Sequence, residues 1–159
     1  MLDKRALNGL NYGVFMLASG VEDQSNGCIV HSAMQVANSP TRIAVSVPND
    51  KLTCEMIRDS SRFTLSVLDQ TLTEQDIRHW DLQSGYNVDK MEGLHLPTDK
   101  YDVPYLDHAT CAMLSCVVEE QLDLKSNSLF IAKVTDGFVL SEAPPLAYLD
   151  YQVKLDNLN

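Results

Sequence analysis

The chain has 159 residues, which is enough for one domain or at most two small ones. Hydrophobic residues make up 45% of it and charged residues 21%, a composition that excludes wholesale disorder. The formal net charge of −10 argues against general binding to nucleic acid or to an anionic membrane, because both select clustered positive charge. The charge is uneven: residues 1–60 hold five basic and six acidic side chains, so this part suits a small anion better than the acidic remainder.

Short alternating segments dominate the first half of the chain. Residues 12–17 are apolar on both faces, as in a strand that is covered on both sides. The polar stretch 19–27 ends in Asn26-Gly27, a pair that favours a tight hairpin turn. Further strands are predicted at residues 28–34, 42–47 and 62–68, a loop at 35–40, and short helices at 53–59 and 71–80.

The second half is less regular at its start. Residues 81–107 show weak periodicity, and a long loop inside a compact domain usually has a function. Strands are then predicted at residues 112–122, 129–134, 138–140 and 147–153. Many short strands with a few small helices indicate a β-barrel with helical decoration. A doubly wound α/β fold is disfavoured, because the first three strands are separated by loops only, and no dinucleotide-binding or P-loop motif is present.

The N-terminus and the cysteines favour a cytoplasmic protein. No apolar stretch of signal-peptide length follows Lys4 and Arg5, and the longest apolar run is far too short to cross a bilayer. No pair of cysteines is in a C-x-x-C arrangement, and the histidines give no metal-ligand spacing with them. We therefore expect reduced structural thiols and no metal site at Cys28, Cys54, Cys111 and Cys116.

The segment from Asn49 to Thr53 is the first candidate for a binding site. It follows a hydrophobic strand and opens a short helix, whose N-terminus offers free N–H groups and a partial positive charge to a phosphate. Lys51 adds a full charge and Thr53 a hydroxyl. The alternative is that Asp50 or Thr53 merely caps the helix and that Lys51 is solvated.

The second candidate is the small-residue segment from Gly27 to Ala33. Small side chains here would let a flat ring approach the backbone closely. His31 and Ser32 point to opposite faces if the segment is a strand, so they do not form a nucleophile–base pair. The alternative is a structural or simply exposed His31. No hydrolytic motif is present, and the catalytic residues stay unassigned from sequence.

Taken in order, these segments resemble the flavin-reductase-like family of FMN-binding split barrels. The resemblance runs from Tyr12-Gly13-Val14 through Asn26-Gly27-Cys28 and Asn49-Asp50-Lys51 to the strand 63–68. The stretch 80–91 is similar to that of the branch whose flavin domain is fused to rubredoxin in anaerobes, and so is the ending 145–151. The resemblance covers nearly the whole chain, so residues 1–159 are expected to form a single domain of this kind.

The resemblance implies a mainly β fold, a six-stranded antiparallel split β-barrel with Greek-key features and a few short helices. It also implies a homodimer with FMN at the subunit interface. In such a site the phosphate meets the residues matching Ser32, Lys51 and Thr53, Asn49 lies near the ribityl chain, and two backbone segments line the ring. The implied cofactor-binding residues are Cys28, Ile29, Val30, His31, Ser32, Ala37, Asn38, Ser39, Asn49, Lys51 and Thr53.

The implied function is an FMN oxidoreductase that takes electrons from NAD(P)H or a protein donor. It would pass them to a free flavin, a small acceptor or an iron protein. The chain departs from the family pattern at three positions: Asn127 replaces a histidine, Asp81 a glycine and Tyr86 an arginine. The departure at Asn127 bears on the use of NAD(P)H as donor. Two alternatives stay open: a non-catalytic FMN-binding electron carrier, and a dimeric interaction domain that has lost its flavin.

Overall fold

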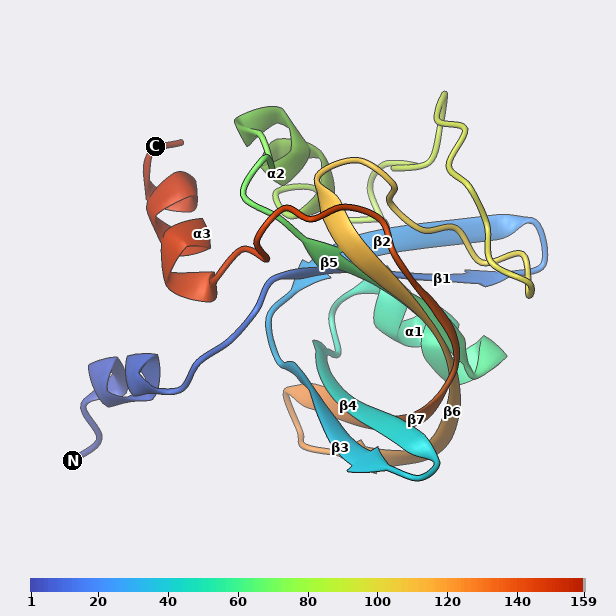
Figure 1. Cartoon of the computed structure of the whole chain (residues 1–159), viewed down its shortest axis with the longest axis horizontal. Coiled ribbons are helices and arrows are strands. Elements are labelled where there is room, and N and C mark those ends of the chain that lie inside the picture. The colour runs from blue at the N-terminus through green and yellow to red at the C-terminus, as the bar shows by residue number, and fades with distance from the viewer. Residues whose placement is uncertain (159) are drawn as a thin grey trace.

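The computed structural model describes residues 1–158, and its centre is an antiparallel sheet. The strands are β1 (Phe15–Val21), β2 (Gln24–Val30), β3 (Ala33–Asn38), β4 (Thr41–Pro48), β5 (Arg62–Leu68), β6 (Thr110–Asp123) and β7 (Asn127–Val139). Their hydrogen-bonded order is β2-β1-β5-β6-β7-β4-β3, and the sheet curves strongly around α1 (Figure 1). The helices are the 3-10 helix η1 (Lys4–Gly9) and the α-helices α1 (Leu52–Ser60), α2 (Glu74–Trp80) and α3 (Tyr148–Asp156).

The mainly β class is confirmed, but the expected number of six strands is wrong, because the sheet has seven. The loop predicted at residues 35–40 is largely strand β3, which pairs with β4. β3 is the last strand in the order, and most of its side chains are exposed, so it lacks the apolar alternation that marks a strand in a sequence. β2 and β3 stand at opposite ends of the strand order, yet only His31 and Ser32 separate them in the chain.

Two apolar clusters hold the sheet and the helices together. One contains Leu17 of β1, Phe63 of β5 and Ile57 of α1. The other contains Met16 of β1, Ile77 of α2 and residues of the C-terminal segment. Neighbouring residues of β1 therefore belong to different clusters, which confirms that this strand is covered on both faces.

The first hairpin turns earlier than the Asn26-Gly27 pair predicts. β1 pairs with β2 from Phe15↔Val30 to Val21↔Gln24, so the turn lies at residues 22–23. Asn26 is buried, and its Nδ2 donates to Thr53 Oγ1 at 2.9 Å. A Cβ on Gly27 would lie 2.6 Å from Met16 Sδ, so this glycine is needed for close packing instead of for a turn.

The C-terminal half departs from the sequence prediction at two places. The separate strands expected at 129–134 and 138–140 form the single strand β7, which pairs along its length with β6. The strand expected at 147–153 is wrong, because this segment is helix α3. Tyr148, Tyr151 and Leu155 have the i, i+3, i+7 spacing of one helix face, and that spacing outweighs the short apolar alternation.

Residues 81–109 contain no named helix or strand, in agreement with the prediction for 81–107. Lys90 anchors this loop from within: it is only 2% exposed, and its Nζ donates to the carbonyls of Gly27 and Trp80, each at 2.9 Å. No helix within residues 1–158 has the length and apolar character that a membrane span requires.

Candidate functional site

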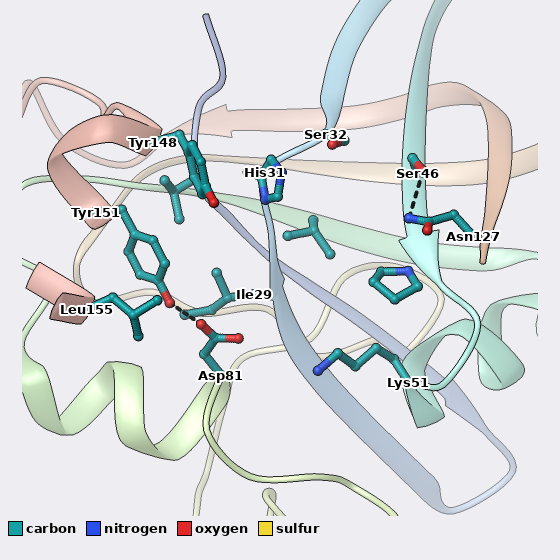
Figure 2. A pocket seen from close by; sticks show the side chains of 13 residues that line it. Ile29, His31, Ser32, Ser46, Lys51, Asp81, Asn127, Tyr148, Tyr151 and Leu155 are labelled. Atoms are coloured by element: carbon teal, nitrogen blue, oxygen red, sulfur yellow. Dashed lines mark hydrogen bonds between the residues drawn. The ribbon is translucent and has the colours of Figure 1, made fainter. Parts of the chain in front are cut away.

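A pocket of about 280 Å³ opens where β2 ends and the chain passes into β3. Ile29, Val30, His31 and Ser32 form one wall of it. The side chains that face them come from elements far apart in the chain: the start of α1, the loop after α2, the start of β7, and α3 (Figure 2). The fold thus brings five of the eleven predicted site residues to one pocket, namely these four and Lys51.

Lys51 supplies the positive charge of this pocket (Figure 2). It occupies the N-cap position of α1, and no side-chain hydrogen bond caps the helix there. The first-turn N–H groups of α1 thus have no side-chain acceptor at the N-cap and carry the partial positive charge of a helix N-terminus. Lys51 belongs to none of the three ion pairs within residues 1–158. This arrangement suits an anionic group such as a phosphate.

His31 of this wall belongs to an aromatic group with Tyr148, which also lines the pocket, and with Tyr12 beside them. The rings of His31 and Tyr148 are stacked, with centroids 4.2 Å apart and an angle of 25° between their planes. Tyr12 meets His31 edge-on at 5.2 Å and 80°. Burial lowers the pKa of His31 below its usual value, with a smaller opposing effect from Asp81, so the imidazole is neutral near pH 7. The wall is therefore flat, aromatic and uncharged.

Asp81 and Tyr151 close the pocket between α2 and α3. The Tyr151 hydroxyl donates a hydrogen bond to the Asp81 carboxylate (Figure 2). Burial and this bond to a carboxylate raise the pKa of Tyr151 well above its usual range, so it stays a donor. The pair connects the loop after α2 to the C-terminal helix and holds the Asp81 charge in place.

Asn127 lies at the start of β7, directly after the turn from β6, and it lines the pocket. Its Nδ2 donates to Ser46 Oγ of β4 at 3.1 Å (Figure 2). The residue that departs from the family pattern therefore lines the same pocket as Lys51 and His31. Its amide offers hydrogen bonds but no charge.

Three predicted residues lie beside the pocket but have their side chains engaged elsewhere. Cys28 is 1% exposed and packs in the cluster around Leu17. The Thr53 hydroxyl is buried and accepts from Asn26. The Asn49 side chain donates to the Lys125 carbonyl at 2.7 Å and accepts from Ser128 at 2.7 Å. Any role of these three in ligand binding stays a prediction.

Ala37, Asn38 and Ser39 lie at the other end of β3, and the structure does not bring them to this pocket. Asn38 lies six positions beyond Ser32 along the strand, which corresponds to about 20 Å. Their predicted contact with a ligand is likewise untested.

The prediction from sequence missed much of the pocket lining. Val14, Ser46, Pro48, Tyr148, Tyr151 and Leu155 line it in addition to the residues above. The helical spacing of Tyr148, Tyr151 and Leu155 could have shown that these three residues share one face of a helix. Val14, Ser46 and Pro48, in contrast, reach the pocket only because distant strands pair. No local pattern in the sequence marks that kind of proximity.

Comparison with known proteins gives matches along nearly the whole chain. The profile of the flavin reductase like domain matches residues 7–155. The chain is 32% identical over 154 residues to a high molecular weight rubredoxin of Moorella thermoacetica, a match that covers 96% of this chain and 67% of that protein. It is 25% identical over 152 residues to the ferric-chelate reductase (NAD(P)H) of Archaeoglobus fulgidus, covering 96% and 90% of the two chains.

Solved structures share the fold. The NADH:FAD oxidoreductase of Streptomyces globisporus C-1027 superposes with a TM-score of 0.79 at 17% identity, covering 92% of this chain and 90% of that one. The flavoredoxin of Methanosarcina acetivorans superposes with a TM-score of 0.74 at 20% identity, covering 83% and 70%.

Proposed function

Because the chain belongs to the family of flavin reductase-like domains, we propose that it is an oxidoreductase that binds FMN in the pocket at the end of β2. The observation that carries the proposal is the pairing of two features in this pocket. Lys51 stands at the uncapped N-terminus of α1, and a flat wall of His31 and Tyr148 lies across from it. A flavin mononucleotide has the matching parts, an anionic phosphate and a planar ring system.

The residues present fit this cofactor. Lys51 and Ser32 line the pocket and supply donors that a phosphate requires, and α1 begins directly after Lys51. The segment from Ile29 to Ser32 lines the same pocket, where a ring would approach it. A pocket of about 280 Å³ whose lining has one lysine offers room and charge for one phosphate group, which favours FMN over the larger FAD.

When bound, FMN supplies the hydride and electron transfer, and the protein supplies binding, orientation and electrostatics. Lys51 and the N-terminus of α1 would hold the phosphate and so fix the position of the ring. His31 and Tyr148 would exclude water beside the ring. N–H groups of the β2–β3 connection would be the donors for hydrogen bonds to the ring.

The proposal includes a homodimer that shares the site. A cavity of about 280 Å³ lies just below the range of about 300–1,000 Å³ that is common for small-molecule sites, so one chain would enclose the cofactor only in part. Met34 and Val36 of β3 are 66% and 48% exposed, which leaves apolar surface for a second subunit. In this arrangement Ala37, Asn38 and Ser39 would reach a flavin across the subunit interface.

The electron donor in the proposal is NAD(P)H or a redox protein. The name of the Archaeoglobus relative supports NAD(P)H, and that of the Moorella relative supports an iron protein as a partner. Asn127 favours the second candidate function, an electron carrier that reacts poorly with nucleotides, because an uncharged amide lines the pocket where the family pattern has histidine.

The test combines a cofactor assay with a turnover assay. We expect the purified protein to be yellow, to release FMN on heating, and to oxidise NADH or NADPH in the presence of free flavin or a ferric chelate. A flavoprotein that is reduced by a protein donor but oxidises neither nucleotide would support the electron carrier instead. A colourless protein that does not quench the fluorescence of added FMN would contradict both.

A further inference from the structure

The first eleven residues form an arm that the rest of the chain does not support. Residues 1–11 are all exposed, and η1 buries none of its side chains. The N-cap of η1 also comes from the arm itself, because the Asp3 side chain accepts a hydrogen bond from the backbone N–H of Arg5. The body of the molecule begins at Tyr12, whose carbonyl accepts from the Tyr148 N–H at 2.9 Å. In Figure 1 the arm extends away from the strands.

This arm needs a partner surface to be stable. A helix of six residues does not hold its shape alone in water, since nucleation is costly and few hydrogen bonds follow. The arm also presents apolar side chains, with Leu2, Leu7 and Leu10 between 47% and 68% exposed. Such a group of leucines on a projecting segment is typical of an interaction element.

The same chain carries a concave apolar surface without an occupant. A cavity of about 320 Å³, which we call the apolar cavity, is lined by residues of every strand except β2. Its lining includes Phe15, Ala33, Met34, Ile43 and Leu65, and all but Gln35 and Thr41 of the lining residues are apolar. β3, which forms its rim, is a terminal strand of the sheet with an unpaired edge.

Resting on the homodimer of the proposed function, we infer that the N-terminal arm of each copy docks in the apolar cavity of a second copy. One convex and one concave apolar surface on each chain allow two identical contacts, which close a two-fold dimer and leave neither surface exposed. Charge does not oppose this contact, because Arg5 of the arm is paired with Asp3 and the lining of the apolar cavity carries no charged residue.

The contact would couple assembly to the proposed flavin site. Ala33 and Met34 line the apolar cavity, and the two residues before them, His31 and Ser32, line the pocket. An arm seated against β3 therefore restrains the segment that forms one wall of the pocket. Loss of the arm should weaken cofactor binding as well as dimerisation.

The first experiment measures self-association by analytical ultracentrifugation. We expect deletion of residues 2–10, and separately the double substitution Leu7→Asp with Leu10→Asp, to raise the dimer dissociation constant at least tenfold. A matched control replaces two equally exposed leucines elsewhere, Leu122→Asp with Leu124→Asp, and should leave it unchanged. The deletion removes no buried side chain, so the body should keep its circular dichroism spectrum.

The second experiment locates the contact by disulfide cross-linking. The four native cysteines are buried and unpaired, so background reaction is low. Chains with Leu7→Cys mixed with chains with Met34→Cys should give a cross-linked species of twice the chain mass, and Leu7→Cys mixed with Leu122→Cys should not. A chain that carries both Leu7→Cys and Met34→Cys gives the opposite test. If it forms only an intramolecular disulfide, the arm covers the apolar cavity of its own chain, and docking between copies is refuted.

The outcomes separate this inference from the proposed function. A dimer that binds FMN but does not respond to either arm variant refutes the docking and leaves the proposed function standing. A dimer that depends on the arm but binds no flavin supports the docking and refutes the proposed function. A protein that is monomeric at all concentrations refutes the docking.

Discussion

Lys51 and Lys90 both lie beside β2, but their amines have opposite surroundings. Lys90 is 2% exposed, and its Nζ donates to two backbone carbonyls, those of Gly27 and Trp80. Burial lowers the pKa of Lys90. Lys51 is partly exposed, lines the pocket, and belongs to no ion pair within residues 1–158.

The different surroundings of the two amines indicate different roles: Lys90 stabilises the fold, and Lys51 is free to bind a ligand. The donors of Lys90 are committed to the chain itself, so its loss should reduce stability. The donors of Lys51 are available, so its loss should reduce ligand affinity and leave stability nearly unchanged. Two predictions test this division, and two more extend the comparison to other residues of the pocket; all four follow in order of expected effect.

Lys90→Met should lower the free energy of unfolding by about 2–4 kcal/mol. The substitution leaves two carbonyls without their donor, at about 1–3 kcal/mol each, while removal of a buried charge offsets part of that loss. Urea unfolding measures the change. Lys51→Met is the matched control and should change stability by less than about 0.5 kcal/mol. Equal effects at the two positions would contradict the division.

Lys51→Ala should weaken FMN binding by about 1–3 kcal/mol, the range for a hydrogen bond to a charged group, which is about 5- to 150-fold. Quenching of FMN fluorescence gives the dissociation constant. Lys133→Ala, which removes the same charge from an exposed position on β7, is the control and should have little effect. If the Lys51→Ala variant binds FMN as tightly as wild type does, Lys51 is only a surface charge.

Asn127→His should speed reduction of bound FMN by NADH several-fold. A histidine at this point of the pocket can carry positive charge toward a nucleotide phosphate, whereas the amide cannot. Stopped-flow absorbance of the flavin records the rate. An unchanged rate, or a wild type that already reacts rapidly at micromolar NADH, would show that Asn127 does not limit the reaction.

The smallest expected effect concerns His31 and pH. Burial lowers the pKa of His31 in the folded chain below its usual value. At pH values between these two, His31 is protonated in the unfolded chain but not in the folded chain. Stability should therefore fall as the pH drops through this window. Unfolding at about pH 7.5 and about pH 5 should show a larger loss in wild type than in His31→Gln.

The extra loss of stability in wild type relative to His31→Gln should stay below about 0.5 kcal/mol, because the His31 ring is only partly buried and water screens its charge. An identical pH dependence in both proteins would mean that His31 titrates alike in the folded and unfolded chains.

The sequence predicted well what depends on local pattern. The strand at 62–68 coincides with β5, and the helix at 71–80 contains α2. Thr73 and Asp76 begin α2 with a reciprocal pair of hydrogen bonds, a local signal. The start of α1 beside Lys51 was likewise found from its own residues.

The features that the sequence did not predict depend on contacts with residues far away in the chain. β3 has mostly exposed side chains, and pairing with β4 is what keeps it a strand. Asn26-Gly27 has the composition of a turn, but Thr53, Met16 and Trp80 give the pair a packing role inside β2. The Lys90 amine was not distinguished from a surface charge, because only the folded loop brings it to Gly27 and Trp80.

Helix α3 carries Tyr148, Tyr151 and Leu155, which follow all seven strands in the chain yet complete the pocket. During synthesis the earlier segments leave the ribosome first and begin to fold first. The strands and α1 can therefore assemble before the last wall of the pocket exists. The pocket is therefore incomplete until residue 155 has emerged, at a point in synthesis when every strand of the sheet is already available to fold.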